Sequence, residues 1–374
     1  MTNGPSSQSQ VEPVPDKLLI FPGGMPRALA FRKQCELTGV ETVGASSLSY
    51  DPAASQYAQW RFLPYVVSQD FPDALVDLIR ACGINGIYTA NPVVWDQLSM
   101  LLPKIAPDVR VVNPAPAAAE EAPYFEAKAA AQEMIGSPLP LATATRLRPA
   151  AAPLELAGIL KMVDAVPGMC DNLKTAALCE VIRSAPDGDV VEIGTWWGKS
   201  ALLLGLLARR YRVGPLLCVD PWSDGHLLQQ DSLLVDGSSQ RLSAQRAFEV
   251  FAMNLLPVAC GTINYLRKPS VEAAASYARV PVVENPGFGR TQYAGSISIL
   301  HIDGNHDLAA VQADIDAWGP FLNPAGGWVI FDDYRWPYGN GPRVVADRFC
   351  NVHQSSIASA FAIGGALFVQ MHGR

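Results

Sequence analysis

The chain has 374 residues, which is enough for two domains. It is 49% hydrophobic and 17% charged, a globular composition that excludes a wholly disordered chain. Its net charge is −7, and an acidic chain without a basic block is a poor candidate for nucleic-acid binding.

Residues 1–16 read as a disordered lead-in, since no basic segment followed by an apolar run marks a signal peptide. The apolar stretches at 201–208 and 355–371 are too short or too interrupted for a spanning helix, which needs about 20 apolar residues. The seven cysteines are widely spaced and form no C-x-x-C, so we expect neither a disulfide scaffold nor a zinc site. We therefore expect a cytoplasmic protein that binds no membrane.

Residues 17–113 predict a small α/β domain. Short apolar runs alternate with helical patterns, and this alternation favours a parallel sheet with helices on its faces. The expected strands are 17–21, 41–45, 86–89 and 109–112, and the expected helices are 25–37, 71–81 and 93–105.

An Ala- and Pro-rich linker is predicted at residues 114–153, with one helix at 124–135. From residue 154 the alternation restarts and continues to residue 374, which predicts a second, larger domain. Its helical segments are expected at 154–185, 199–211, 246–256, 308–322 and 344–351, and its strands at 189–193, 215–219, 262–266, 296–302, 327–331, 357–363 and 366–371.

The first strand of this second domain runs into a glycine-containing turn and then a helix. Gly194 permits a tight turn, and Gly198 lets a ligand approach the backbone. Free N–H groups at the helix start can hold a carboxylate or a phosphate. The spacing fits neither a Walker A loop nor G-x-G-x-x-G, so an ordinary strand-to-helix turn is the alternative.

An acidic residue, Asp220, ends the next strand. An acid at this place can accept hydrogen bonds from ribose hydroxyls, as in dinucleotide sites. Because Pro221 follows, a helix-capping aspartate is the alternative.

The segment Glu192-Ile-Gly-Thr-Trp-Trp-Gly-Lys-Ser, followed by Asp220-Pro-Trp, resembles class I S-adenosylmethionine (SAM)-dependent methyltransferases. The branch it is similar to contains the macrocin-type sugar and natural-product O-methyltransferases, and the resemblance covers roughly residues 155–371. It implies a Rossmann-like sheet with helices on both faces, with SAM held by the glycine turn and its ribose by Asp220. The implied cofactor-binding residues are Glu192, Gly194, Thr195, Gly198, Lys199, Ser200, Asp220, Trp222 and Asp303.

Three carboxylates follow two later strands of the same domain. Asp303 ends one strand, and Asp332 and Asp333 end the next. If these strands are adjacent, the carboxylates converge at one edge of the sheet and repel unless a cation is bound. Oxygen ligands suit Mg²⁺ or Ca²⁺, so we predict that Asp303, Asp332 and Asp333 bind Mg²⁺.

His306 follows Asp303 by three residues in the motif I-D-G-N-H-D. In the metal-dependent branch that the chain resembles, a basic residue at this offset takes the proton of the acceptor hydroxyl, whose pKa the metal lowers. His306 and Asp303 are therefore the predicted catalytic residues. A surface residue capping the following helix is the alternative for His306, and the family resemblance gives Asn305 no role.

Other segments near the strand ends are candidates for contact with the acceptor. The polar insertions at 223–245 and 284–293 could form an acceptor pocket or a lid, or be surface loops. Trp196 and Trp197 could wall the cofactor or pack against a helix. Tyr334, Arg335, Trp336 and Tyr338 follow the acidic pair and could contact a flat or sugar acceptor.

The N-terminal segment Leu18-Leu-Ile-Phe-Pro-Gly-Gly, with the strands at 41 and 86, resembles the small leading domain of ATP-grasp ligases. The nucleotide- and metal-binding body of that family has no counterpart in this chain, so we infer no ligase activity. We expect this domain to assemble a homo-oligomer or to shape the acceptor site.

The sequence thus predicts a Mg²⁺-assisted, SAM-dependent O-methyltransferase acting on a hydroxyl of a sugar, polyketide or peptide-like metabolite. Alternatives are a metal-independent N-methyltransferase and a non-catalytic binding or assembly protein. An Fe(II)- and O₂-dependent enzyme is disfavoured, because the acidic cluster lacks the two histidines of the usual facial triad. An NAD-dependent oxidoreductase is disfavoured, because the glycine turn does not fit G-x-G-x-x-G.

Overall fold

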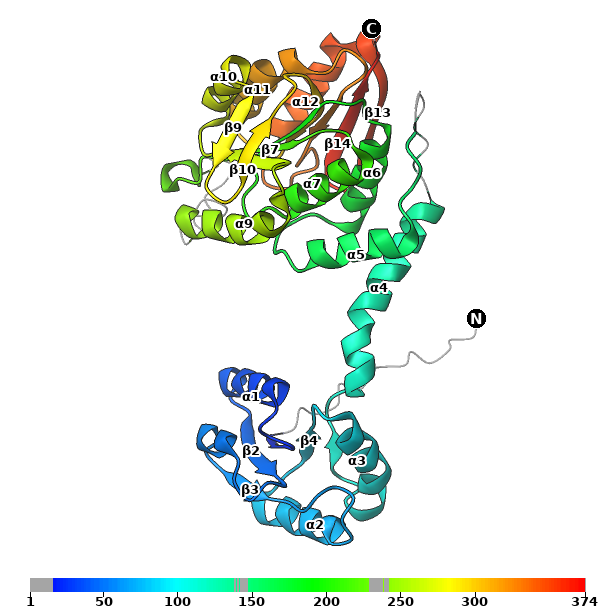
Figure 1. The fold of residues 1–374 in the computed structure, drawn as a ribbon, viewed down its shortest axis with the longest axis vertical. Helices are drawn as coiled ribbons and strands as arrows, with labels where there is room; N and C mark the ends of the chain where they lie inside the picture. Colours follow the sequence, from blue (N-terminus) through cyan, green and yellow to red (C-terminus); the bar gives the residue numbers. More distant parts are fainter. Residues whose placement is uncertain are drawn as a thin grey trace, which may run out of the picture. The chain divides into compact units, whose positions relative to one another are not determined.

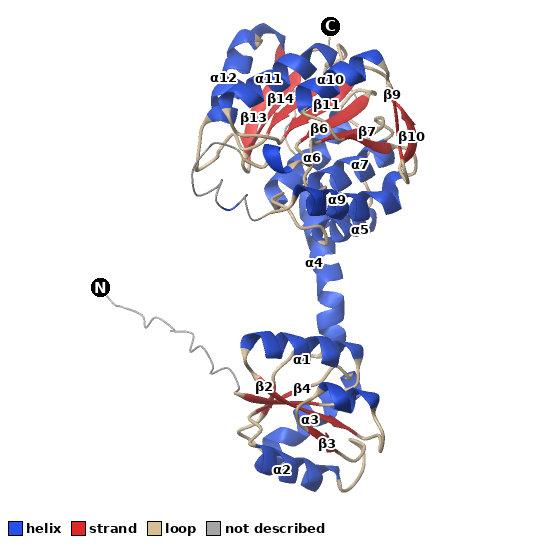
Figure 2. Cartoon of the chain, turned by 90° about the vertical axis from the view of Figure 1, so that its left-hand side faces the viewer, coloured by secondary structure: helices blue, strands red, loops and turns tan. Residues whose placement is uncertain are grey.

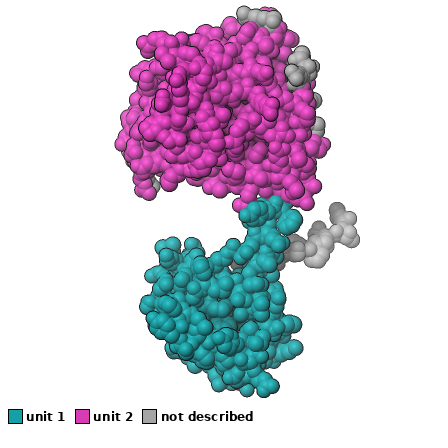
Figure 3. Space-filling model, viewed as in Figure 1, with its two compact units in different colours: residues 1–125 teal, residues 126–374 magenta. Residues whose placement is uncertain are grey.

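The computed structural model of the protein describes residues 16–137, 139, 141, 147–228, 238 and 242–373. The chain forms two compact units, Met1–Phe125 and Glu126–Arg374, which Figure 3 colours separately. The predicted lead-in lies outside the described residues except for Asp16, as do parts of the linker at 114–153 and most of the insertion at 223–245.

The N-terminal unit contains a five-stranded, fully parallel sheet in the order β3-β2-β1-β4-β5. Its core is built by strand side chains and by the apolar face of helix α2, which buries Phe71, Leu75 and Leu78 at helical spacing. The elements are β1 (Lys17–Ile20), α1 (Pro26–Thr38), β2 (Glu41–Ser46), β3 (Trp60–Phe62), α2 (Phe71–Cys82), β4 (Gly86–Tyr88), α3 (Pro92–Ile105) and β5 (Arg110–Val111).

Helix α4 (Pro116–Gly136) begins earlier in the chain than the helix predicted at 124–135. Its Pro123 lies inside the helix, and its Ala127 and Ala131 are buried in the core of the second unit. No helix among the described residues is long and apolar enough to cross a membrane.

The C-terminal unit is built on a seven-stranded sheet in the order β13-β14-β12-β11-β6-β7-β8 (Figure 1). Its strands are parallel except for β14, which is antiparallel to both of its neighbours. The elements are α5 (Pro153–Asp164), α6 (Asn172–Ser184), β6 (Asp189–Ile193), α7 (Lys199–Tyr211), β7 (Leu216–Val219), α9 (Ala244–Ala259), β8 (Ile263–Leu266), α10 (Ser270–Arg279), β9 (Val282–Asn285), β10 (Gly289–Gln292), β11 (Ile297–Ile302), α11 (Leu308–Trp318), β12 (Trp328–Phe331), α12 (Gly341–Val352), β13 (Ile357–Ile363) and β14 (Ala366–Met371).

Helices cover both faces of this sheet, as Figure 2 shows. Successive strand residues point to opposite faces, so Val190 packs with α5, α6, α7 and α9, whereas Val191 packs with α10, α11 and α12. The strands at the centre of the sheet, β6, β7, β11 and β12, are buried on both faces and are mostly apolar, as expected of parallel strands. The Rossmann-like α/β fold class is confirmed.

Several elements differ from the sequence prediction. The helical region expected at 154–185 is two helices, α5 and α6, separated by residues 165–171. Strand β3 and helix α10 were not predicted, and the insertion at 284–293 belongs to an antiparallel ribbon of β9 and β10.

Candidate functional site

The predicted site residues lie at or just after the carboxyl ends of four neighbouring strands, β7, β6, β11 and β12. Backbone hydrogen bonds continue the ladders beyond the strand ends: the Asp303 N–H donates to the Ile193 carbonyl at 2.8 Å, and the Asp332 N–H to the Ile302 carbonyl at 2.9 Å. The carboxyl ends of the strands are thereby aligned, at the edge where open α/β sheets place their ligand sites.

Two glycines shape the turn after β6. Gly194 has φ +80°, and a Cβ there would lie 2.0 Å from the Asp303 carbonyl oxygen, so only glycine fits. Gly198 has φ +87° and is the N-cap of α7, but no side chain caps the helix. The N–H groups of the first turn of α7 therefore suit a ligand carboxylate.

The other predicted cofactor residues near this turn lie at the start of α7 or beside it. Thr195 and Ser200 are buried. Lys199 is partly buried and is the first residue of α7. A cation is not favoured by the helix dipole at this position, whereas an anionic ligand is.

Asp220 holds the glycine turn against the end of β7. Its carboxylate accepts hydrogen bonds from the backbone N–H groups of Trp196, at 3.0 Å, and Trp222, at 2.8 Å. Burial raises the pKa of Asp220, and these two N–H groups oppose that rise. A carboxylate has about four acceptor positions, so Asp220 retains capacity for ribose hydroxyls.

The indole of Trp222 is enclosed in the core, although the sequence predicted it to bind the cofactor. Only 1% of this residue is exposed, and its ring lies 4.6 Å from that of Phe251 and 5.2 Å from that of Phe248. The indole N–H donates to the Trp196 carbonyl at 2.9 Å. Trp196 and Trp197 are partly buried and pack against the same core.

Backbone strain gathers in the loops at this edge of the sheet. Trp196, Trp222 and Asp333 have φ values of 48°, 38° and 50°, a region that residues other than glycine seldom adopt. They lie in the loops after β6, β7 and β12. Strained residues of this kind cluster at ligand sites, because the surrounding structure must be built to hold them.

Lys174, which the sequence analysis did not single out, joins two of the predicted metal ligands. Its ammonium Nζ, carried by α6, forms ion pairs with Oδ2 of Asp303, at 3.2 Å, and with Oδ2 of Asp332. The lysine side chain is only 4% exposed. Burial opposes its charge, but Asp303 and its other acidic neighbours outweigh burial and raise the pKa of Lys174.

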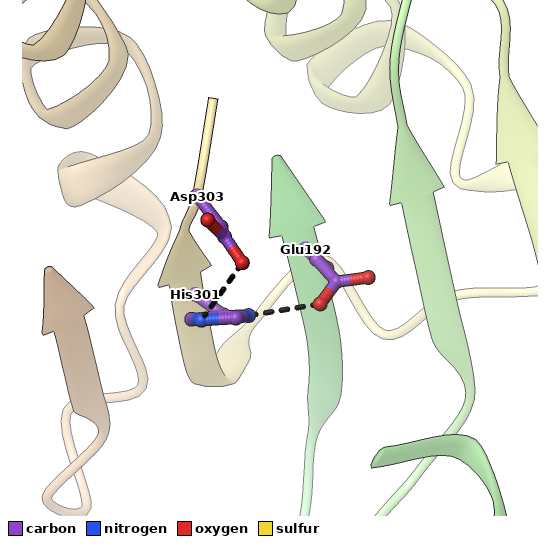
Figure 4. Close-up of side chains that lie close together, drawn as sticks. All are labelled: Glu192, His301 and Asp303. Atoms are coloured by element: carbon purple, nitrogen blue, oxygen red, sulfur yellow. Dashed lines mark hydrogen bonds and ion pairs between the residues drawn. The ribbon is translucent and has the colours of Figure 1, made fainter. Parts of the chain in front are cut away.

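His301 lies between Glu192 and Asp303, as Figure 4 shows. His301 and Glu192 are register partners on β11 and β6, and Nδ1 of His301 lies 2.9 Å from Oε1 of Glu192. Burial, reinforced by Lys174, lowers the pKa of His301 to about 3, and burial raises the pKa of Glu192 to about 7. Nδ1 of His301 and Oε1 of Glu192 thus share a buried hydrogen bond.

His306 is buried and pairs with Asp333. Its Nε2 lies 2.8 Å from Oδ2 of Asp333, and the ring of Trp336 lies 4.5 Å from the imidazole. Asp307, and not His306, caps the following helix, because the Asp307 side chain accepts hydrogen bonds from the first N–H groups of α11. His306 and Asp333 thus form a pair of a buried imidazole and a partly exposed carboxylate.

The predicted three-carboxylate magnesium site does not fit the side chains as they lie. Asp303 and Asp332 share a protein cation, Lys174, and Asp333 is engaged by His306. Binding of Mg²⁺ by all three acids would require both arrangements to break. A different group, Glu192, His301 and Asp303, brings one ligand atom from each residue within 4.8 Å of the others.

The predicted acceptor-side residues have mixed surroundings. The Tyr334 hydroxyl donates to Asp347 at 2.8 Å, and the Arg335 N–H donates to the Gly365 carbonyl at 3.0 Å. Tyr338 is half exposed, and its ring lies 5.2 Å from that of Trp336. In the insertion at 284–293, the β9–β10 ribbon is pinned by the side chain of the buried Asn264 on β8.

Comparisons with known proteins give a family match to part of the C-terminal unit and distant similarities to solved structures. Residues 191–334 match a family model described as a methyltransferase domain. The chain is 16% identical to the O-methyltransferase NovP, over 68% of this chain and 99% of NovP, with a TM-score of 0.37. It is 12% identical to an O-methyltransferase family protein from Burkholderia thailandensis, over 70% of this chain and 74% of that one, with a TM-score of 0.31. A SAM-dependent methyltransferase from Aquifex aeolicus is 10% identical, over 57% of this chain and 97% of that one, with a TM-score of 0.33.

The matched segment runs from β6 to the loop after β12 and so contains the glycine turn, Asp220, Asp303 and the acidic pair. Residues 191–334 therefore carry a methyltransferase domain, and this domain supports SAM-dependent methyl transfer by the C-terminal unit.

Proposed function

We propose that the protein methylates a hydroxyl group of a small-molecule acceptor, with His306 as the general base. The observation that carries this proposal is the His306–Asp333 pair at the carboxyl edge of the sheet. A hydroxyl must lose its proton as its oxygen is methylated, whereas a neutral amine can attack through its lone pair. A buried base with an orienting carboxylate therefore favours oxygen as the acceptor atom.

When bound, SAM supplies an electrophilic methyl group on a positively charged sulfur. The acceptor oxygen takes the methyl group as the bond from carbon to sulfur breaks, and the hydroxyl proton goes to the imidazole of His306, which Asp333 contacts through Nε2. Asp333 holds the imidazole in one orientation and stabilises its positive charge after proton transfer. Trp336 packs beside the imidazole and limits the positions that an acceptor can take.

The proposed cofactor residues divide by the part of SAM they would hold. The uncapped N–H groups of α7 and the ammonium of Lys199 suit the carboxylate of the methionine part. Asp220 suits the ribose through its remaining acceptor positions. Glu192, Thr195 and Ser200 support the turn from the buried side, and Asp303 closes it through its backbone contact with Gly194.

Calorimetric titration with SAM, followed by a screen of hydroxyl and amine acceptors, tests this function. Asp220→Ala should weaken SAM binding, whereas His306→Ala should bind SAM normally and lose methyl transfer. His372→Ala is the matched control, since this exposed histidine lies outside the site. Methylation of amines alone, or full activity of His306→Ala, would overturn the proposal, and failure of the wild type to bind SAM would favour a binding or assembly role.

A further inference from the structure

A compact polar cluster lies buried beneath the proposed acceptor site. Its members are Lys174 of α6, His301 of β11, and Asp303 and Asp332, which follow β11 and β12. All three sheet residues lie on the face that packs against α6, because side chains two residues apart point to the same face. Lys174 reaches this cluster from the first turn of α6. The backbone N–H of Lys174 donates a hydrogen bond to the carboxylate of Asp171, the N-cap of this helix, at 2.7 Å.

The cluster requires a cation. Asp303, which is partly exposed, and the buried Asp332 both direct Oδ2 to the Lys174 ammonium, and two carboxylates that share one cation repel when both are charged. His301 is committed to a different acid, because its Nδ1 lies 2.9 Å from Oε1 of Glu192. Among the described residues, Lys174 is the positively charged side chain whose ion pairs join the two acids.

The imidazole of His301 adds a nitrogen ligand beside the two carboxylates that pair with Lys174, and this set of side chains resembles a metal site. Nε2 of His301 lies 3.8 Å from Oδ2 of Asp303 and 3.6 Å from Oδ2 of Asp332. In the neutral tautomer that donates to Glu192, Nε2 carries a lone pair. This buried atom makes no hydrogen bond to any described residue. The two carboxylate oxygens that pair with the Lys174 ammonium therefore both lie near this imidazole nitrogen, and Figure 4 draws His301 and Asp303 of this group.

We propose that Lys174 is the resident cation of this cluster, in place of a divalent metal ion, and that removing its ammonium leaves a metal site formed by His301, Asp303 and Asp332. The lysine then keeps the two acids fixed under the loops that carry His306 and Asp333. This inference concerns the same site as the proposed function, but its main test does not depend on methyl transfer. If both hold, EDTA leaves methyl transfer unchanged.

Binding of Mn²⁺ to EDTA-treated full-length protein, followed by electron paramagnetic resonance and calorimetry, tests the inference. The wild type should bind no stoichiometric Mn²⁺. Lys174→Met, which keeps the length of the side chain and removes its charge, should bind one Mn²⁺ at least about tenfold more tightly than the wild type. His301→Ala in the Lys174→Met background should weaken that binding at least about tenfold. Lys268→Met is the control, because this lysine bonds Ser276 outside the cluster.

Two results would overturn the inference. One is stoichiometric Mn²⁺ binding by the wild type that Asp303→Asn abolishes, since the lysine would then yield its place to metal. The other is a folded Lys174→Met protein, judged by circular dichroism and thermal unfolding, that binds no Mn²⁺. The wild-type titration and Lys174→Arg, expected to bind no Mn²⁺, keep the test decisive if Lys174→Met does not fold. SAM titration of the same samples tests the proposed function separately.

Discussion

The two sheets of this protein share a parallel layout and a glycine turn after a central strand, yet they fill their carboxyl edges differently. After β1, the turn of the N-terminal unit is packed by aromatic rings: a Cβ on Gly23 would lie 2.8 Å from the Trp60 ring, and the Tyr57 hydroxyl donates to the Gly23 carbonyl at 2.9 Å. After β6, the turn of the C-terminal unit packs on backbone beside buried acids, a lysine and histidines.

The two units also differ in the polar side chains that they bury. Among the described residues of the N-terminal unit they are Ser46 and Thr89, which are neutral. In the C-terminal unit they include Lys174, Glu192 and Asp332. Burying charge is costly, and a fold keeps it where it is paired and used. Parallel topology alone therefore does not make a site, whereas the buried ionisable groups at one edge do.

The largest expected effect is a loss of catalysis. If it were absent, the carboxyl edge of the C-terminal sheet would not be a catalytic site, and the contrast between the two sheets would fail. His306→Ala should lower kcat by about 10²- to 10⁴-fold, because it removes the base, and Asp333→Asn should lower kcat less, because the imidazole remains. Steady-state kinetics with a hydroxyl acceptor measures both. His372→Ala should retain wild-type kcat, and an equal loss in this control would point to a general defect.

The glycine turns offer the next test. Gly194→Ala should destabilise the C-terminal unit by about 3–5 kcal/mol and abolish SAM binding, because φ is +80° and its Cβ would meet the Asp303 carbonyl. Gly39→Ala, at the end of α1, should cost only about 1 kcal/mol, since φ is +75° but no atom lies within 4 Å. Calorimetric unfolding of the full chain compares them. Equal losses would contradict the role assigned to the close approach at Gly194.

Much of this fold follows from local pattern, and the departures have physical causes. Strands such as β6 and β11 were predicted because most of their residues are apolar, as strands buried on both faces require. Strand β3 has three residues and is mostly exposed, so it leaves little periodic signal. The β9–β10 ribbon looked like a polar insertion because its outward residues, such as Glu284 and Arg290, are charged.

The site was predictable only in part, for a similar reason. Motif spacing identified His306 and the acidic residues, and the structure brings them to neighbouring strand ends. Lys174 left no local signal, because its partners Asp303 and Asp332 lie 129 and 158 residues away. His301 did carry one: it stands two residues before Asp303 on a strand, and alternation places both side chains on one face.

A buried acid outside the proposed site tests how this unit tolerates charge. Burial raises the pKa of Asp314 on α11 from 3.8 to about 6. The folded state therefore favours the protonated carboxyl, so this contribution to stability is complete below about pH 4 and is lost as the pH rises through 6. Asp314→Asn should raise the free energy of unfolding by about 1–3 kcal/mol at pH 8 and by almost nothing at pH 4.

Denaturant unfolding of wild type and Asp314→Asn at both pH values measures this difference. Asp316→Asn is the matched control, because Asp316 is exposed on the same helix and accepts a hydrogen bond from Gln312. It should show no such pH dependence. A gain for Asp314→Asn that is the same at pH 4 and pH 8 would show that ionisation of this carboxyl is not its cause.

The smallest expected effect sharpens the comparison from the N-terminal side. Tyr57→Phe removes the hydroxyl that donates to the Gly23 carbonyl and leaves that buried acceptor without this donor, so it should cost about 1–2 kcal/mol. Peptide-level hydrogen exchange should show faster opening around β1 and β2, with SAM affinity and kcat unchanged. Because side chains fill the edge after β1, loss of this hydrogen bond should lower the stability of the N-terminal unit and change no binding or kinetic constant. A change in SAM affinity or in acceptor KM would instead make this edge part of the functional site.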